Sequence, residues 1–245
     1  MGKTLRVKKS FQYKPRMIPS EGKHTRTLIY LHGMDSTPLH CKGRGVRDTP
    51  LNFPGLRVVL PGAEWMYVDA YEEEMVSWFD ITWKRDWEKT GNVRVVPASL
   101  RAATDRIVAV VLREVERVGA ENVYLGGISM GMMMGLHVLM DARLPALGGF
   151  VGIVGDLLDE TIARAMTARA ARRRVPIRCF FGENDKLVPP ALGRKLLRRL
   201  KAHGFDVADM TIPNAGHNAV VVEKTGLRNF FGELIPEAVP RRLQR

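Results

Sequence analysis

The sequence predicts an α/β fold, in which a mostly parallel central sheet carries helices on both faces. Two observations predict this class. Short apolar runs of strand length alternate along the chain with longer segments whose apolar residues recur at helical spacing, and the runs end at turn residues. Such alternation is typical of parallel strands joined by crossover helices. At 245 residues, 45% of them hydrophobic, the chain is long enough for one domain of this kind.

The individual elements follow in order along the chain. Two strand candidates come early, residues 27–31 and 57–60, and each ends at a turn that contains glycine. A long helix then begins at Pro97 and ends at Gly119, with apolar side chains every three or four positions. After it, strands are expected at 123–128, 150–154, 177–181 and 207–212, and helices directly after Ser129 and at 160–172 and 192–203.

The predicted domain boundary falls near residue 25. Eight Lys or Arg and one acid, Glu21, lie between Met1 and Arg26, so residues 1–25 are predicted to form a basic N-terminal arm. Residues 26–245 are predicted to form a single domain, because they contain no linker, internal repeat or low-complexity tract. The basic bias would also suit an organellar presequence, and that alternative stays open.

The net charge of +12 predicts attraction to anionic partners. The basic residues are scattered and match no nucleic-acid motif, so nucleic acid is not an expected partner. Peripheral contact with an anionic membrane remains open. Helix 192–203 would offer a basic amphipathic surface for such contact, although helices of this kind usually bury their leucines in the domain. The sequence does not predict the oligomeric state.

Cysteine usage and the lack of long apolar stretches predict a cytoplasmic protein. Cys41 and Cys179 cannot form a disulfide framework, which suits a reducing compartment. No apolar stretch approaches the roughly 20 residues that cross a bilayer, and the N-terminus has no hydrophobic signal core.

The segment Gly127-Ile128-Ser129-Met130-Gly131 predicts a nucleophile elbow. It follows an apolar run of strand character and leads into a helix-like segment, so the serine would stand on a sharp strand-to-helix turn. The flanking glycines leave room where a side chain would clash. This pattern also occurs by chance, so the prediction of an elbow depends mainly on the strand before the motif and the helix after it.

Asp185 and His217 complete a predicted catalytic triad with Ser129. Each follows a later strand candidate, which gives the chain order serine, acid, histidine that is expected of an α/β-hydrolase. The imidazole would take the proton of the serine hydroxyl, and the carboxylate would fix the imidazole tautomer. Asp156 is the competing acid, because it also follows a strand. Taken singly, the three residues could instead be a helix cap, a turn cap and a loop histidine.

Backbone amides of Met34 and Met130 are the predicted oxyanion donors. In this fold one donor follows the nucleophile and the other lies in an early loop after a strand, here residues 31–37. The combination of His32 with His40 and Cys41 matches no familiar metal site, so a metal is not expected.

An aromatic segment between the second strand candidate and the long helix is the remaining feature. It contains Trp78 and Phe79, and it could form the wall of a substrate groove. A hydrophobic patch that covers the core is an equally good interpretation of the residues alone.

In these motifs the chain resembles the phospholipase/carboxylesterase family, whose best-known members are acyl-protein thioesterases. The resemblance lies in Leu31-His32-Gly33 with Asp35, Ser77-Trp78-Phe79-Asp80-Ile81, Leu125 to Gly131, Gly182-Glu183-Asn184-Asp185 with Val188-Pro189, and Gly216-His217. It spans roughly residues 27–222, and the Trp-Phe-Asp segment separates this family from other hydrolases. Two departures stand out: the early loop is one residue shorter than the family's His-Gly-x-Gly-Asp, and Met130 replaces a common glutamine.

The resemblance implies a serine hydrolase that cleaves carboxylic esters or thioesters through an acyl-Ser129 intermediate, and it implies no cofactor. S-acylated proteins are the implied substrates, with general carboxylesterase or lysophospholipase activity as alternatives. Trp78, Phe79, His32 and Val188 are then expected to contact the substrate. An alternative of another class is a non-catalytic binding protein of this fold, which the presence of all three triad residues disfavours.

Overall fold

The computed structural model describes residues 11–39, 54–83, 93–218 and 220–235. Its main sheet has seven strands in the order β12-β11-β10-β9-β3-β4-β2. All neighbouring pairs are parallel except β2 and β4, which are antiparallel. The strands are β2 (Arg16–Ile18), β3 (Arg26–Leu31), β4 (Leu56–Leu60), β9 (Val123–Ile128), β10 (Gly149–Ile153), β11 (Ile177–Gly182) and β12 (Val207–Ile212).

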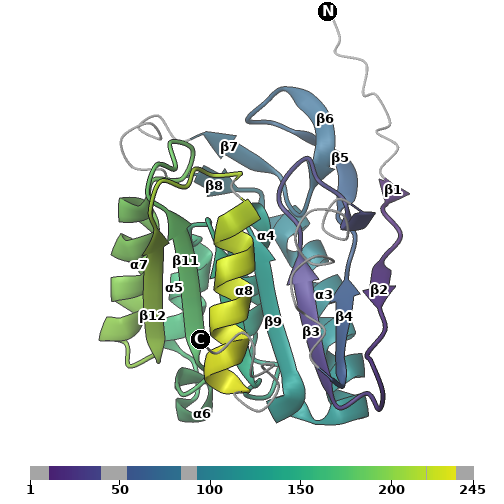
Figure 1. Ribbon diagram of the computed structural model, residues 1–245. Helices are drawn as coiled ribbons and strands as arrows, with labels where there is room; N and C mark the ends of the chain where they lie inside the picture. The colour runs from purple at the N-terminus through teal and green to yellow at the C-terminus, as the bar shows by residue number, and fades with distance from the viewer. Residues whose placement is uncertain (1–10, 40–53, 84–92, 219, 236–245) are drawn as a thin grey trace, which may run out of the picture.

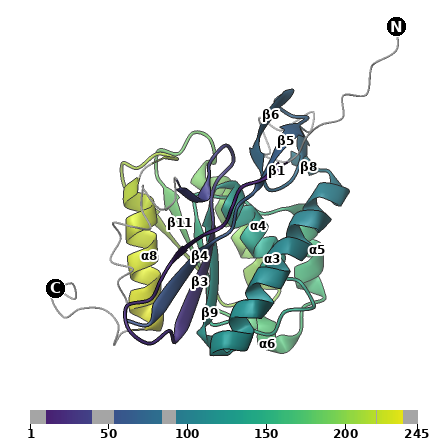
Figure 2. The ribbon, with the colours of Figure 1, turned by 90° about the vertical axis from the view of Figure 1, so that its right-hand side faces the viewer.

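Helices cover both faces of this sheet. Figure 2 shows α8 on one side of the sheet and α3, α4 and α5 on the other, and α7 packs against α5 and β12. The helices are α3 (Pro97–Val118), α4 (Met130–Leu139), α5 (Asp159–Met166), α6 (Ala170–Arg173), α7 (Pro190–Ala202) and α8 (Val220–Leu234), with a short 3-10 turn η1 (Ala120–Asn122). The predicted fold class is therefore confirmed.

The core has two parts because the central strands are buried on both faces. In β3 the side chains from Leu28 to Leu31 are fully buried, and they alternate between the two sides of the sheet. Ile29 and Leu31 join the apolar cluster under α3 and α4. Leu28 and Tyr30 join the cluster under α8. A strand buried on both faces must be apolar throughout, which is why these strands were predictable.

Two small sheets lie above the carboxyl ends of the central strands (Figure 1). One consists of β1 (Phe11–Gln12), β5 (Glu64–Val68) and β6 (Glu73–Ser77), in the order β1-β5-β6, and the other pairs β7 (Ile81–Trp83) with β8 (Val93–Val95). Strands β5 and β6 form an antiparallel hairpin in which Val68 pairs with Glu73. The sequence did not predict these strands.

The predicted separation of residues 1–25 from the domain is wrong for its described part. Strand β1 pairs with β5, and β2 pairs with β4 at the edge of the main sheet. Residues 11–18 therefore belong to the same folded unit as the rest of the chain. Residues 1–10 lie outside the described residues.

The predicted helix over 160–172 is also wrong, because two helices, α5 and α6, occupy that segment. The helical hydrogen bonds end at Thr167, and Arg169 has an extended backbone. The second helix turns Arg172 inward, where its guanidinium donates to the carbonyl oxygens of Met140 and Leu144. Among the described residues, no helix is long and apolar enough to cross a membrane.

The packing of α8 predicts a large loss of stability for Phe230→Ala. The ring is fully buried and makes edge contacts with Tyr124 and Phe231. We expect its removal to lower the free energy of unfolding by about 3–5 kcal/mol, measured by urea denaturation. Val221→Ala is the matched control on the same helix, because Val221 is 51% exposed. Equal losses in both variants would contradict the packing.

Candidate active site

Ser129 stands on the turn between β9 and α4, in a backbone conformation that few residues adopt. Its φ is 54° and its ψ is −123°, which places it in the strained left-handed half of the Ramachandran map. Its amide donates a hydrogen bond of 2.8 Å to the carbonyl oxygen of Ile153 in β10. The turn is therefore held by the neighbouring strand, as a nucleophile elbow requires.

The flanking glycines are required by close backbone contacts. A Cβ atom added to Gly131 would overlap the carbonyl oxygen of Leu31, and one added to Gly127 would lie 2.5 Å from the backbone of Gly131. Both distances are too short for any side chain. The motif thus packs strand β9, helix α4 and the loop after β3 into direct contact around the serine.

Hydrogen bonds join Ser129, His217 and Asp185 into one chain. His217 Nε2 lies 2.9 Å from Ser129 Oγ, and His217 Nδ1 lies 2.8 Å from Asp185 Oδ2. The other carboxylate oxygen, Oδ1, accepts the amides of Leu187 at 2.9 Å and Val188 at 2.8 Å. These bonds fix the carboxylate, so that its free oxygen faces the imidazole. In this arrangement the imidazole can accept the serine proton.

The competing acid, Asp156, lies elsewhere. It is buried and its Oδ1 accepts the amide of Leu157 at 2.8 Å. Burial raises the pKa of this carboxyl from 3.8 to about 6. The hydrogen bond of His217 goes to Asp185, so the structure brings together the three residues of the predicted triad and leaves Asp156 outside it.

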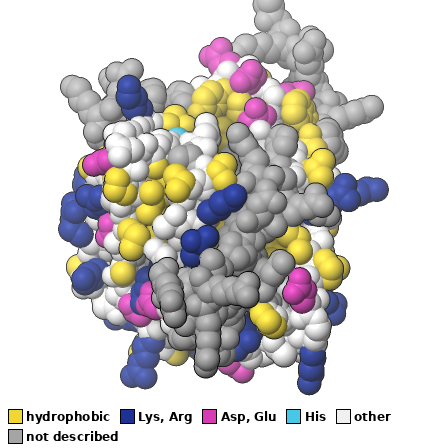
Figure 3. Space-filling view, in the orientation of Figure 1, with side chains coloured by type: hydrophobic (Ala, Val, Ile, Leu, Met, Phe, Trp, Pro, Cys, Tyr) yellow, Lys and Arg dark blue, Asp and Glu magenta, His cyan; other side chains and the backbone are white. Residues whose placement is uncertain are grey.

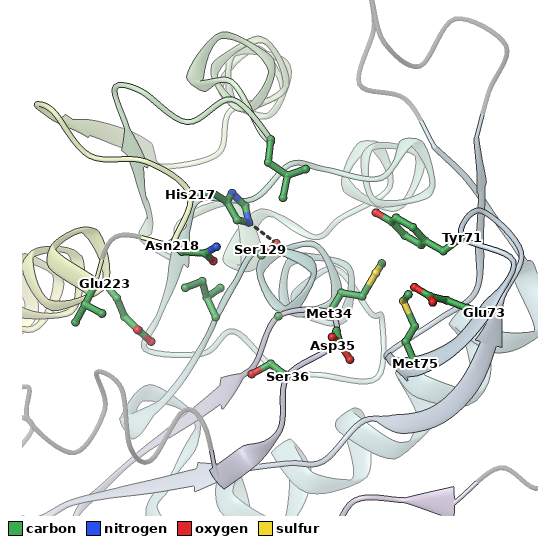
Figure 4. Close-up of a pocket in the computed structure, with 14 residues that line it drawn as sticks. Met34, Asp35, Ser36, Tyr71, Glu73, Met75, Ser129, His217, Asn218 and Glu223 are labelled. Atoms are coloured by element: carbon green, nitrogen blue, oxygen red, sulfur yellow. Dashed lines mark hydrogen bonds between the residues drawn. The ribbon is translucent and has the colours of Figure 1, made fainter.

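The two amides predicted to bind an oxyanion flank the same serine. Met34 and Ser129 line one pocket (Figure 4), and Met130 begins helix α4 directly after Ser129. Neither amide has a hydrogen-bond partner among the described residues. A Cβ atom added to Gly33 would touch that of Ser129 at 3.4 Å, so the loop before Met34 approaches the serine closely. Unpaired amides at this position are suited to a developing negative charge.

The loop that carries Met34 is fixed by buried polar groups. Trp78 Nε1 donates to the carbonyl oxygen of His32 at 2.8 Å. The ring of His32 accepts the amide of Ala63 at Nε2, 3.2 Å away, so its proton lies on Nδ1, which donates to the carbonyl oxygen of Gly33 at 2.8 Å. The next amide, of Asp35, donates to Val76. This network sets the path of the backbone on both sides of Met34.

The burial of His32, Trp78 and Phe79 contradicts their predicted contact with substrate. All three side chains are at most 1% exposed, and none lines the pocket. His32 and Trp78 lie behind the oxyanion loop because the imidazole and the indole donate hydrogen bonds to its carbonyl oxygens. Val188 does not line the pocket either; its amide holds Asp185, while its neighbour Leu187 faces the pocket.

The pocket beside Ser129 has a volume of about 500 Å³. It is lined by Gly33, Met34, Asp35, Ser36, Tyr71, Glu73, Met75, Ile128, Ser129, Leu187, His217, Asn218, Val220 and Glu223. The wall formed by Tyr71, Glu73 and Met75 comes from the β5–β6 hairpin, which the sequence did not predict. One available signal was the run Glu72-Glu73-Glu74, which is unusual in a chain of net charge +12.

The fold and this pocket define an α/β-hydrolase of the serine hydrolase class. The chain belongs to the phospholipase/carboxylesterase family, whose sequence model matches residues 13–235. It is 27% identical over 236 residues to acyl-protein thioesterase 1 of Gibberella zeae, across 91% of this chain and 96% of that protein. It is 24% identical to acyl-protein thioesterase 1 of Neurospora crassa, across 94% and 96%.

A solved structure shows the same fold. The crystal structure of Zea mays acyl-protein thioesterase 2 matches with a TM-score of 0.72 and 19% identity, and it covers 90% of this chain and 98% of that one. The likeness extends over nearly all of both chains. The predicted resemblance to the phospholipase/carboxylesterase family is therefore confirmed.

The hydrogen bonds of the two acids predict different outcomes for Asp185→Asn and Asp156→Asn. An amide at position 185 can present its NH2 group to Nδ1 and so favour the wrong imidazole tautomer. We expect Asp185→Asn to lower kcat/KM for an ester substrate about a thousandfold or more. Asp156→Asn should change it by less than about threefold, because Asp156 does not contact the imidazole. A larger loss in Asp156→Asn than in Asp185→Asn would contradict this site.

The raised pKa of Asp156 predicts a pH-dependent gain in stability for Asp156→Asn. The folded carboxyl holds its proton up to about pH 6 and the unfolded one only to about 3.8. Between these values the folded state binds more protons, so the wild type loses stability as the pH rises. Asparagine keeps the oxygen that accepts the Leu157 amide and cannot ionise. The gain should be near zero below pH 4 and about 1–3 kcal/mol above pH 6, measured by denaturation at several pH values. A gain in stability that does not change with pH would contradict the raised pKa of Asp156.

Proposed function

We propose that this protein is an acyl-protein thioesterase that releases fatty acyl groups from S-acylated proteins through an acyl-Ser129 intermediate. The observation that carries the proposal is the hydrogen-bonded chain from Asp185 through His217 to Ser129, next to the backbone amides of Met34 and Met130, which have no hydrogen-bond partner in the described part of the chain. The names of the fungal relatives support the substrate class. A general carboxylesterase or a lysophospholipase is the second candidate, since the family includes both activities.

The proposed reaction has two halves. In the first, His217 Nε2 takes the proton of Ser129 as its oxygen attacks the thioester carbonyl, and the amides of Met34 and Met130 stabilise the tetrahedral oxyanion. The C–S bond then breaks, and the imidazolium of His217 gives its proton to the leaving thiolate. In the second half a water molecule loses a proton to His217 and attacks the acyl-serine. Collapse of that intermediate returns the proton to Ser129 and releases the fatty acid.

The apolar part of the pocket supports an acyl substrate. Met34, Met75, Ile128, Leu187 and Val220 contribute apolar side chains around the serine. Methionine adapts its shape to irregular ligands, and a pocket of about 500 Å³ lies in the range of small-molecule sites. The acyl chain is proposed to lie against these side chains.

The alternative of a non-catalytic binding protein is not favoured by this geometry. A binding module has no need for a serine hydroxyl that is hydrogen-bonded to an oriented imidazole beside unpaired amides. Peripheral contact with anionic membranes and a cytoplasmic location stay predictions from charge and composition. In α7, Leu197 and Leu200 are buried in the domain, so any membrane contact by this helix would depend on its exposed basic side chains.

A fluorophosphonate probe and a series of p-nitrophenyl esters test the proposed function. The probe should label the wild type and leave Ser129→Ala unlabelled, because no other hydroxyl is hydrogen-bonded to His217 among the described residues. Rates on esters should rise from acetyl to octanoyl and longer chains, and the enzyme should release palmitate from an S-palmitoylated peptide.

Two results separate the alternatives. Labelling of Ser129→Ala at the wild-type level would remove Ser129 as the nucleophile. Maximal rates on the shortest esters, without palmitate release, would favour a general carboxylesterase over the thioesterase.

A further inference from the structure

The pocket beside Ser129 is acidic in a protein that is otherwise strongly basic. Its lining includes Asp35, Glu73 and Glu223, and no Lys or Arg lines it within residues 11–39, 54–83, 93–218 and 220–235, although the whole chain carries 38 Lys and Arg against 26 Asp and Glu. Figure 3 shows acidic side chains gathered at the upper end of the molecule, where β5 and β6 lie, while most Lys and Arg lie along the sides and the lower end. On this face, acidic side chains are therefore concentrated near β5 and β6, and Glu73 of β6 lines the pocket.

The side chains of Asp35 and Glu73 are exposed. Among the described residues, neither accepts a hydrogen bond or forms an ion pair. Arginine pairs with many other acids of the chain: Glu64, Asp105, Glu114, Asp141, Asp159, Asp206, Asp209 and Glu233. Of the arginines whose positions the structure describes, none therefore forms an ion pair with the two carboxylates that border the pocket.

Backbone structure fixes the positions of these carboxylates. Asp35 directly follows Met34 in the oxyanion loop, and its amide is held by Val76. Glu73 is anchored in β6 by its pairing with Val68. In Figure 4 both lie on the side of Ser129 away from His217, and Tyr71, which is 41% exposed, lies beside Glu73. An aromatic ring next to carboxylates is a favourable setting for an ammonium or guanidinium group.

We propose that these two carboxylates select substrates in which lysine or arginine flanks the acylated residue. The inference rests on the proposed function. The hydrogen-bonded pair of Ser129 and His217, and not the two carboxylates, indicates that a substrate binds in this pocket. A fatty acyl chain carries no charge, so the attracted cation belongs to the leaving group. A lysophospholipid fits less well, because its phosphate would lie closer to the ester bond than its ammonium does. The same carboxylates repel the fatty acid anion and so favour its release.

Two S-octanoyl cysteine peptides of equal length, one with flanking lysines and one with flanking glutamates, test this selection. At about 20 mM salt the wild type should show a kcat/KM about tenfold higher for the lysine peptide, and at about 500 mM salt the ratio should fall toward one, since screening weakens exposed charges. The double variant Asp35→Asn, Glu73→Gln should show a ratio near one at both salt concentrations. Both replacements keep the size of the side chain and one acceptor oxygen while they remove the negative charge.

Glu116→Gln is the matched control. Glu116 is exposed on α3, near the end of the helix that leads to the start of β9, whereas Ser129 follows the other end of that strand. Glu116→Gln removes one negative charge far from the pocket. It should leave the ratio of kcat/KM between the lysine and glutamate peptides unchanged. A ratio near one in the wild type at low salt, or an equal loss in Glu116→Gln, would overturn the proposal.

Hydrolysis of uncharged p-nitrophenyl octanoate separates the two possible failures. If the enzyme hydrolyses this ester through Ser129 but shows no peptide preference, only the charge selection is wrong. If it hydrolyses neither the ester nor the peptides, the proposed function is wrong. Preference for lysophosphatidylcholine over the lysine peptide at equal acyl length would assign the carboxylates to a lipid and contradict the peptide assignment.

Discussion

The hydrogen bond between His217 and Ser129 is the interaction on which the active site depends. Its partners are 88 residues apart in sequence, and the central sheet brings them together. Strand β9 delivers Ser129 at its carboxyl end, and the loop after β12 delivers His217 to the same edge. Because helices cover both faces, the sheet is a rigid base, and the strained turn at Ser129 is held by neighbours on every side. The site geometry is thus a property of the whole domain.

The central strands and the triad could be predicted because their signals are local. A strand that is buried on both faces, such as β9, is a continuous apolar run bounded by turns, and its predicted bounds match the observed ones. The elbow glycines are dictated by contacts within a few residues of Ser129. Topology then brings the carboxyl ends of parallel strands to one edge, so residues that follow different strands converge without any pairwise signal in the sequence.

The pocket wall and α8 could not be predicted because tertiary contacts determine them. The hairpin of β5 and β6 mixes charged and apolar residues, and its partner β1 lies more than 50 residues earlier. Helix α8 contains Gly226, which weakens a helix, yet a Cβ atom there would lie 2.6 Å from the side chain of Ile153, so close packing on the sheet requires it. Trp78 suggested a groove wall, whereas its hydrogen bond to the oxyanion loop holds it in the core. In each case packing outweighed the local pattern.

Mass spectrometry of the enzyme quenched in acid during turnover of p-nitrophenyl octanoate can detect the acyl-Ser129 intermediate itself. Acid quenching preserves an acyl ester, and proteolysis then locates it. We expect a mass increase of one octanoyl group on the peptide that contains Ser129, and none on the other peptides. An octanoyl group on a different residue, or steady ester hydrolysis with no acylated peptide in quenched samples, would contradict it.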